Sequence, residues 1–167
     1  MLKVSKIEKA YGTSKVLRGI DFRMEEGERI AIMGPSGSGK STLLNCIGGI
    51  DRPDNGEVLF EDLSLTSLTE QELCKLRRNK ISTIFQFFHL LPTLTARENI
   101  EFPMLLNSIG KSERNEKVDE LLDAVKIQHR ACAFPHELSG GEKQRVAIAR
   151  SLSMQPKLIL ADEPTGN

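Results

Sequence analysis

The segment Gly34-Pro-Ser-Gly-Ser-Gly39-Lys40-Ser41 constrains the fold of this chain more than any other feature of the sequence. An apolar run at 30–33 precedes it, and residues 42–47 after it have helical character. Glycines between a strand and a helix let backbone N–H groups turn inward, and the helix N-terminus adds partial positive charge. The pattern G-x-x-x-x-G-K-[ST] in this context predicts a phosphate-binding loop. The alternative is a glycine-rich turn that only caps a helix.

In such a loop Lys40 reaches the β- and γ-phosphates of a nucleotide, and the Ser41 hydroxyl binds Mg²⁺. The residues expected to surround the phosphates are Gly34, Pro35, Ser36, Gly37, Ser38, Gly39, Lys40, Ser41 and Thr42.

A second candidate region is the end of the apolar run Leu160-Ala161, where Asp162 and Glu163 follow directly. In open α/β sheets, ligands gather at the carboxyl ends of strands. Asp162 is placed to hold Mg²⁺, and Glu163 to orient and deprotonate an attacking water. Alone, two carboxylates after a strand would more often be a solvated strand end, but the upstream phosphate loop favours the catalytic interpretation.

The segment Leu138-Ser-Gly-Gly-Glu-Lys-Gln144 predicts another helix start. Ser139 and Glu142 have capping-box spacing, and Gly140 and Gly141 leave the first-turn N–H groups unshielded. One domain has no evident need of two phosphate cradles. The second cradle therefore suggests a nucleotide held by a partner copy, while a mere helix cap is the alternative.

Composition limits the classes of function. Lys plus Arg and Asp plus Glu are equal at 23 each, so the whole chain has no net field that steers it toward nucleic acid or anionic membrane. Cys46, Cys74 and Cys132 form neither a disulfide framework nor a zinc pattern, which favours a reducing cytosol. No stretch reaches the roughly 18 apolar residues of a spanning helix, so another chain or segment would have to cross a membrane.

Hydrophobic patterning predicts an α/β fold with two kinds of sheet. Residues 16–24 alternate as a half-exposed antiparallel strand, with Ile20, Phe22 and Met24 on one face. The continuous apolar runs 30–33, 81–85 and 158–161 are typical of parallel strands covered on both faces. The helix signals are the Thr69–Glu72 and Thr95–Glu98 capping boxes and the helical spacing of Val118, Leu121, Leu122 and Val125.

Taken together, the phosphate loop, Leu138–Gln144 and Asp162-Glu163 resemble the nucleotide-binding domain of ABC transporters, with its Walker A, signature and Walker B segments. The resemblance implies that Tyr11 stacks on adenine and that Gln86 senses Mg²⁺ and the γ-phosphate. It also implies that Ser139, Gly140, Gly141 and Glu142 close over the ATP of a partner in a head-to-tail homodimer. Without the family, Tyr11 could be a packing residue and Gln86 a polar residue at a strand end.

The fold implied is an α/β P-loop NTPase of ABC type, with a mixed sheet, an antiparallel β subdomain and an all-helical insertion. We expect one domain over 1–167, with its core at 1–87 and 139–167 and a helical subdomain at 88–138. Family members continue with a further strand that carries a switch histidine and lies between the P-loop and Walker B strands. The C-terminal part of the core is therefore expected to be missing, and the isolated chain to be unstable or weakly active.

Three segments resemble the branch of lipoprotein-release, macrolide-export and cell-division ATPases: Gly48–Pro53, Phe85–Pro92 and Asp162–Asn167. That branch implies a membrane permease contacted by residues 87–100, and a cytoplasmic location, peripheral on the inner face of the cell membrane. The leading hypothesis is an ATPase that drives this permease. Its expected catalytic residues are Glu163, Lys40 and Gln86, and its expected Mg²⁺ ligands are Ser41, Gln86 and Asp162.

Two other functions stay open at this point. One is an ATP-gated regulatory scaffold of cell-division type, without transport. The other is a nucleic-acid-associated ABC ATPase that uses Lys75, Arg77, Arg78 and Lys80; no nucleic acid is expected, because such a charge run near a helix end is usually solvated.

Overall fold

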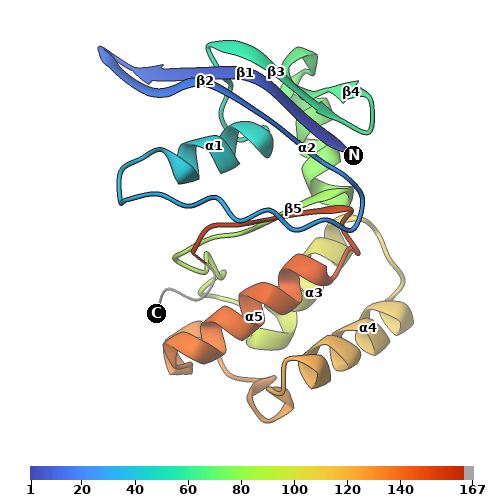
Figure 1. Ribbon diagram of the computed structural model, residues 1–167. Helices are drawn as coiled ribbons and strands as arrows, with labels where there is room; N and C mark the ends of the chain where they lie inside the picture. Colours follow the sequence, from blue (N-terminus) through green and yellow to red (C-terminus); the bar gives the residue numbers. More distant parts are fainter. Residues whose placement is uncertain (164–167) are drawn as a thin grey trace. The chain divides into compact units, whose positions relative to one another are not determined.

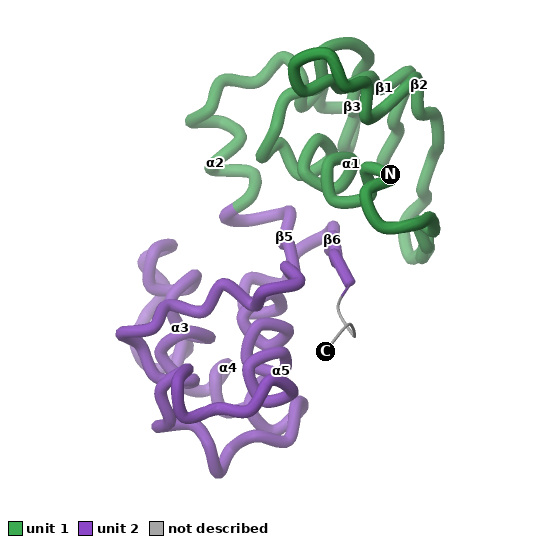
Figure 2. Tube along the Cα trace, turned by 90° about the vertical axis from the view of Figure 1, so that its left-hand side faces the viewer, with its two compact units in different colours: residues 1–77 green, residues 78–167 purple. Residues whose placement is uncertain are grey.

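The computed structural model describes residues 1–163. The chain divides into two compact units, residues 1–77 and residues 78–167 (Figure 2). The division into 1–87, 88–138 and 139–167 that the sequence suggests stays a prediction.

The first unit contains an antiparallel sheet with the strand order β2-β1-β3-β4. Its strands are β1 (Leu2–Tyr11), β2 (Ser14–Met24), β3 (Asn55–Phe60) and β4 (Leu63–Ser64). Tyr11 pairs with Ser14, so Gly12 and Thr13 form a tight hairpin turn. The strand predicted at 16–24 lies within β2, where Ile20, Phe22 and Met24 are half-buried and Asp21 and Arg23 are exposed. Its antiparallel, half-exposed character is confirmed.

Helix α1 (Lys40–Ile47) lies on one side of this sheet (Figure 1). It buries Leu43, Cys46 and Ile47. Burial raises the pKa of the Cys46 thiol to about 11, so this cysteine stays protonated at neutral pH. Helix α2 (Glu70–Asn79) begins at the predicted capping box, where the Thr69 N–H and hydroxyl donate to Glu72 Oε2 at 2.8 and 2.7 Å.

The strand expected at 30–33 is not formed. Residues 29–35 have no regular structure, Met33 is 89% exposed and Ile30 is 45% exposed. A strand persists only where a neighbour takes up its backbone N–H and C=O groups, and no strand among residues 1–163 pairs with this segment. The apolar run at 30–33 therefore stays without a strand partner among residues 1–163.

The second unit contains a separate parallel pair, β5 (Ile81–Ile84) and β6 (Leu158–Ala161). Residues 1–163 therefore contain one antiparallel and one parallel sheet, in line with the two kinds of sheet that the hydrophobic patterning predicts. Leu158 and Leu160 are buried, whereas Ile159 is 42% exposed. The expected coverage of both faces was wrong for β6, because its alternate side chains point to a face that the described residues leave open.

Helices make up the rest of the second unit. They are α3 (Ala96–Leu106), α4 (Lys111–Ala124) and α5 (Gly140–Leu152), with short 3-10 turns η2 (Gln128–Arg130) and η3 (Pro135–Glu137). Residues 88–138 contain no strand, as predicted for an all-helical stretch. The three helices share one core, formed by Ala96, Ile100, Met104, Val118, Leu121, Leu122, Ile127, Leu138, Val146 and Ala149.

None of the helices within residues 1–163 is both long enough and apolar enough to cross a membrane.

The helical core gives a stability prediction. Leu122 is 1% exposed, so Leu122→Ala leaves a cavity among α3, α4 and α5 and should lower the free energy of unfolding by about 2–5 kcal/mol. Leu105→Ala is the control, because Leu105 is 52% exposed and its loss should cost less than about 0.5 kcal/mol. Urea denaturation followed by circular dichroism measures both. Equal losses in the two variants would contradict the packing described here.

Candidate functional site

The predicted phosphate loop forms the approach to α1 in the first unit. Ser38 N–H donates to Pro35 O at 3.2 Å, and Leu43 N–H donates to Gly39 O at 2.8 Å as the helix begins. Gly37 and Gly39 both have positive φ, 78° and 97°. Positive φ at alternate residues of a loop turns the neighbouring N–H groups toward one concave side, and a Cβ on Gly37 would meet nothing within 4 Å. The loop therefore has the shape of an anion cradle.

Gly39 cannot be replaced without strain. It is the residue before α1 and has left-handed backbone geometry. A Cβ there would lie 2.7 Å from Val16 Cγ1 and 3.1 Å from Leu17 Cδ2 on β2. The close approach between loop and strand explains why this position needs glycine.

Lys40 is the first residue of α1, and its side chain reaches back to the loop. Its Nζ donates to Gly34 O at 2.9 Å and to Pro35 O at 3.0 Å. The ammonium is thus held against the same backbone that forms the cradle. Ser41 and Thr42 follow in the first turn of α1, as predicted.

Tyr11, at the end of β1, belongs to the same unit. The residue is 51% exposed, while its hydroxyl donates to Asp51 Oδ2 at 2.5 Å and lies close to the Thr42 side chain. Hydrogen bonding to the Asp51 carboxylate raises the pKa of the Tyr11 phenol. The contact with Thr42 places an exposed aromatic side chain beside the first turn of the phosphate-loop helix.

The second unit brings together two of the predicted catalytic residues. β5 and β6 run parallel with Ile84 opposite Ala161, and Asp162 N–H donates to Ile84 O at 2.9 Å. Gln86 and Glu163 follow these strand ends, and Gln86 Nε2 donates to Glu163 Oε2 at 2.9 Å. Asp162 is adjacent. The side chains of Gln86 and Glu163 are therefore neighbours at one end of the strand pair, and the backbone of Asp162 is bonded to β5 beside them.

The signature segment forms the start of α5. The Ser139 hydroxyl accepts from Glu142 N–H at 3.3 Å, and Glu142 Oε2 accepts from Ser139 N–H and Oγ at 2.8 Å each, which confirms the capping box. The Ser139 backbone N–H, together with its hydroxyl, holds the pKa of the Glu142 carboxyl below its usual value. Leu138 is buried while Ser139, Gly140 and Gly141 are exposed. The glycine N–H groups therefore face solvent.

Arg150 has a structural role that the sequence analysis does not assign. From α5, its guanidinium donates to Phe88 O at 2.7 Å and to His89 O at 2.6 Å. Phe88 and His89 have positive φ, 56° and 48°, which is unusual for residues other than glycine. Arg150 thus stabilises an irregular backbone just after Gln86. An arginine within a helical pattern carries no signal for this contact.

The side chains proposed for Mg²⁺ fit its chemistry. Ser41, Asp162 and Gln86 offer hydroxyl, carboxylate and amide oxygens, which are hard donors. No group of three or more His, Cys, Asp or Glu side chains that could hold a metal occurs within residues 1–163.

Comparison with known proteins decides the family. The model of the ABC transporter family matches residues 17–166. The chain belongs to the ABC transporter family. It is 47% identical over 170 residues to an uncharacterized ABC transporter ATP-binding protein, YknY of Bacillus subtilis, covering 99% of this chain and 74% of that protein. It is 46% identical over 171 residues to the lipoprotein-releasing system ATP-binding protein LolD of Legionella pneumophila, covering 100% of this chain and 75% of LolD.

Solved structures agree with this assignment. A dimeric post-hydrolysis state of the ATP-binding cassette MJ0796, bound to ADP and Pi, superposes with a TM-score of 0.93 at 42% identity. The superposition covers 99% of this ABC transporter chain and 75% of the MJ0796 chain. The predicted ABC fold and the ATPase class are confirmed. Of the branch motif at 162–167, residues 164–167 lie outside the described part of the chain.

The loop geometry gives a prediction on Gly39. Gly39→Ala should lower the free energy of unfolding by at least about 1–2 kcal/mol, since left-handed geometry is costly for alanine and its Cβ meets Val16. Gly140→Ala is the matched control, because a Cβ there meets nothing within 4 Å and alanine favours helix. Thermal unfolding of the two variants and the parent tests this. A Gly39→Ala variant as stable as Gly140→Ala would contradict the geometry.

Proposed function

We propose that this ABC transporter chain is an ATP-binding subunit that hydrolyses Mg-ATP as a head-to-tail homodimer and drives a membrane permease. The contact between Gln86 and Glu163 carries the proposal. These residues are 77 positions apart in the sequence, and the sequence predicts a role at the γ-phosphate for each of them. Their hydrogen bond supports a shared catalytic function.

Glu163 is proposed as the general base. A carboxylate suits this role when it is close to the attacking water and does not bind the metal. Gln86 Nε2 donates to Glu163 Oε2, so the amide orients the carboxylate. The other end of the amide, Gln86 Oε1, is an oxygen that fits Mg²⁺. One glutamine side chain can therefore connect the position of the metal with that of the base.

The phosphate contacts are proposed for the loop at 34–42. Its backbone N–H groups and the N-terminus of α1 favour anionic phosphates. Lys40, held by the carbonyls of Gly34 and Pro35, supplies positive charge beside them. Ser41 and Asp162 are the proposed Mg²⁺ ligands, with Asp162 acting through water. The metal would neutralise charge on the transferring phosphoryl group.

The proposal that the chain dimerises rests on the second cradle, at the start of α5. Gly140 and Gly141 expose the first-turn N–H groups of α5, a helix of 13 residues. These groups can bind the ATP of a partner copy. The similar cassette MJ0796 was solved as a dimer, which supports this arrangement.

The permease and its location belong to the same proposal. Relatives such as LolD are named as parts of a lipoprotein-releasing system, which favours an export or release role over the regulatory alternative. We propose residues 87–100 as the contact with the permease and the inner face of the cell membrane as the location. Phe87 is 75% exposed, and the buried Asn99 side chain donates to Leu91 O and Leu94 O at 3.1 and 2.9 Å. An exposed apolar residue on an ordered segment suits protein docking.

The catalytic role of Glu163 is directly testable. Glu163→Gln keeps the size and a polar group but removes the base, so ATP turnover should fall by at least about a hundredfold. ATP and Mg²⁺ should then trap a dimer in gel filtration. Glu120→Gln, a surface glutamate paired with Lys117, is the control and should keep turnover. Normal turnover by Glu163→Gln would refute the assignment.

The second cradle predicts a variant that is stable but inactive. Gly140→Ala has room for its Cβ in the monomer and should not lower the free energy of unfolding. The same Cβ would stand where a partner's phosphate approaches the N–H groups, so ATP-dependent dimerisation and turnover should fall about tenfold or more. Light scattering and phosphate release measure the two effects. Full activity with an intact fold would show that the start of α5 does not take part in binding the partner's ATP.

A further inference from the structure

Residues 48–53 have no part in the phosphate chemistry, yet they have a fixed place after α1. Ile50 N–H and Asp51 N–H donate to the same carbonyl, Asn45 O, at 2.9 and 3.2 Å. Gly49 has φ +63°, and a Cβ on it would lie 2.7 Å from Leu73 Cδ2. The chain turns sharply here and positions Asp51 relative to the phosphate-loop helix.

Both oxygens of the Asp51 carboxylate contact residues at the end of β1. Its Oδ2 accepts from the Tyr11 hydroxyl at 2.5 Å. Its Oδ1 forms an ion pair with Lys9 Nζ at 3.0 Å and accepts from Arg52 N–H at 2.8 Å. Lys9 Nζ also donates to Arg52 O at 2.7 Å and lies 5.4 Å from the centre of the Tyr11 ring. The ring is thus held through its hydroxyl and flanked by a cation.

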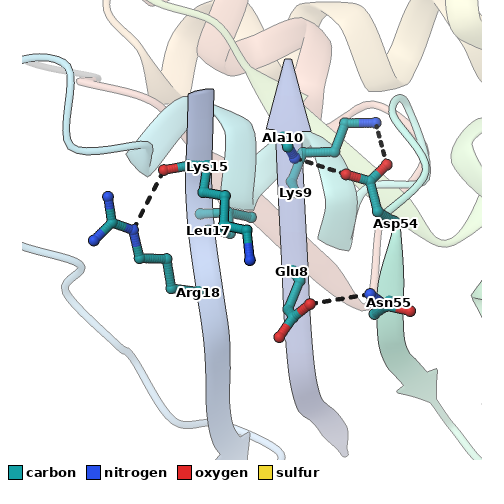
Figure 3. Close-up of a pocket in the computed structure, with 8 residues that line it drawn as sticks. All are labelled: Glu8, Lys9, Ala10, Lys15, Leu17, Arg18, Asp54 and Asn55. Atoms are coloured by element: carbon teal, nitrogen blue, oxygen red, sulfur yellow. Dashed lines mark hydrogen bonds and ion pairs between the residues drawn. The ribbon is translucent and has the colours of Figure 1, made fainter. Parts of the chain in front are cut away.

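Asp54 holds the neighbouring backbone instead of the ring. Its Oδ2 accepts from Ala10 N–H at 2.7 Å, and its Oδ1 is 3.6 Å from Lys9 Nζ, as Figure 3 shows. Asn55 Nδ2 donates to Glu8 Oε2 at 3.0 Å one step further along β1. The residues that make these contacts line part of a depression of about 280 Å³ on the sheet. Asp54 therefore resembles Asp51 in charge and location but differs in what it positions.

We propose that Asp51 is a positioning residue for recognition of the nucleotide base, holding the Tyr11 ring ready to stack on a purine. The inference rests on the proposed function and on the stacking of Tyr11 on adenine that the family resemblance implies. A half-exposed tyrosine that rotated freely would lose side-chain entropy whenever a base stacked on it. Asp51 removes that freedom beforehand, while Thr42 and the turn after α1 keep the ring beside the phosphate loop.

The electrostatics keep this contact in place at neutral pH. The hydrogen bond from Tyr11, followed by that from Lys9, lowers the pKa of the Asp51 carboxyl. The same carboxylate raises the pKa of the Tyr11 phenol. Asp51 is therefore ionised and Tyr11 protonated, the pairing in which a charge-assisted hydrogen bond is strongest.

The test compares ATP with inorganic tripolyphosphate, which has phosphates but no base. By titration calorimetry with Mg²⁺ on the 167-residue chain, Tyr11→Ala should weaken ATP binding about tenfold or more, as expected for loss of stacking. Asp51→Ala should weaken ATP binding about three- to tenfold, because the ring remains but is no longer oriented. Tripolyphosphate binding should be unchanged in both variants. Asp54→Asn, whose amide oxygen still accepts from Ala10, should bind ATP like the parent.

A second measurement needs no nucleotide. Tyr11 is the single tyrosine and the chain has no tryptophan, so phenolate absorbance in an alkaline titration reports Tyr11 alone. Asp51→Ala and Asp51→Asn should lower the phenol pKa, whereas Asp54→Asn should leave it unchanged. Asp51→Asn also keeps an acceptor for the phenol and should restore most of the ATP affinity lost in Asp51→Ala.

The outcomes separate the two proposals. If Tyr11→Ala weakens ATP binding but Asp51→Ala does not, the positioning role of Asp51 is wrong and the role of Tyr11 stands. If Asp51→Ala weakens ATP and tripolyphosphate equally, Asp51 acts through the loop or α1, which also overturns the inference. If Tyr11→Ala leaves ATP binding intact, the proposed stacking fails, and base positioning by Asp51 fails with it. An unchanged phenol pKa in Asp51→Ala would show that the two side chains are not in contact.

Discussion

The parallel pairing of β5 with β6 is the constraint on which the catalytic end of the second unit depends. Four residue pairs, from Ile81 with Leu158 to Ile84 with Ala161, fix the register. That register sets Gln86 and Glu163 at adjacent strand ends, where their side chains hydrogen-bond. A slip by one residue would turn the side chains of one strand to the opposite face and separate the two groups. Backbone hydrogen bonds between four-residue strands thus decide the geometry of the proposed base.

The first unit depends on a different constraint, the fit of α1 and its flanking loops against the sheet. Gly39 allows the loop before α1 to approach β2, and Gly49 allows the chain after α1 to turn back. Between these points the Tyr11 hydroxyl has contacts with Thr42 at one end of the helix and with Asp51 beyond the other. The phosphate cradle and the exposed aromatic side chain are therefore parts of one packed arrangement.

Charge in this ABC transporter chain acts locally. Equal numbers of acidic and basic residues leave no net field, so each proposed anion site has its own source of positive potential. In the phosphate loop this source is Lys40 together with the start of α1. In the signature segment it is the start of α5, where the capping carboxylate of Glu142 is bonded to Ser139. Helix N-termini and short-range hydrogen bonds place positive potential at defined positions, whereas a basic surface would spread it over a wide area.

The sequence alone determined the features that are local in the chain. The glycine-lysine loop before α1, the capping boxes at Thr95 and Ser139, the antiparallel strand and the helical stretch all follow from spacings of a few residues, and the structure contains them. The apolar run at 30–33 failed as a prediction because a strand requires a neighbour, and apolar composition does not supply one. Only tertiary structure decided that Gln86 meets Glu163, that Arg150 holds the backbone of Phe88 and His89, and that Asp51 holds Tyr11. These contacts join residues 40 to 77 positions apart, and which of many charged side chains meets a given partner is set by strand register and helix packing.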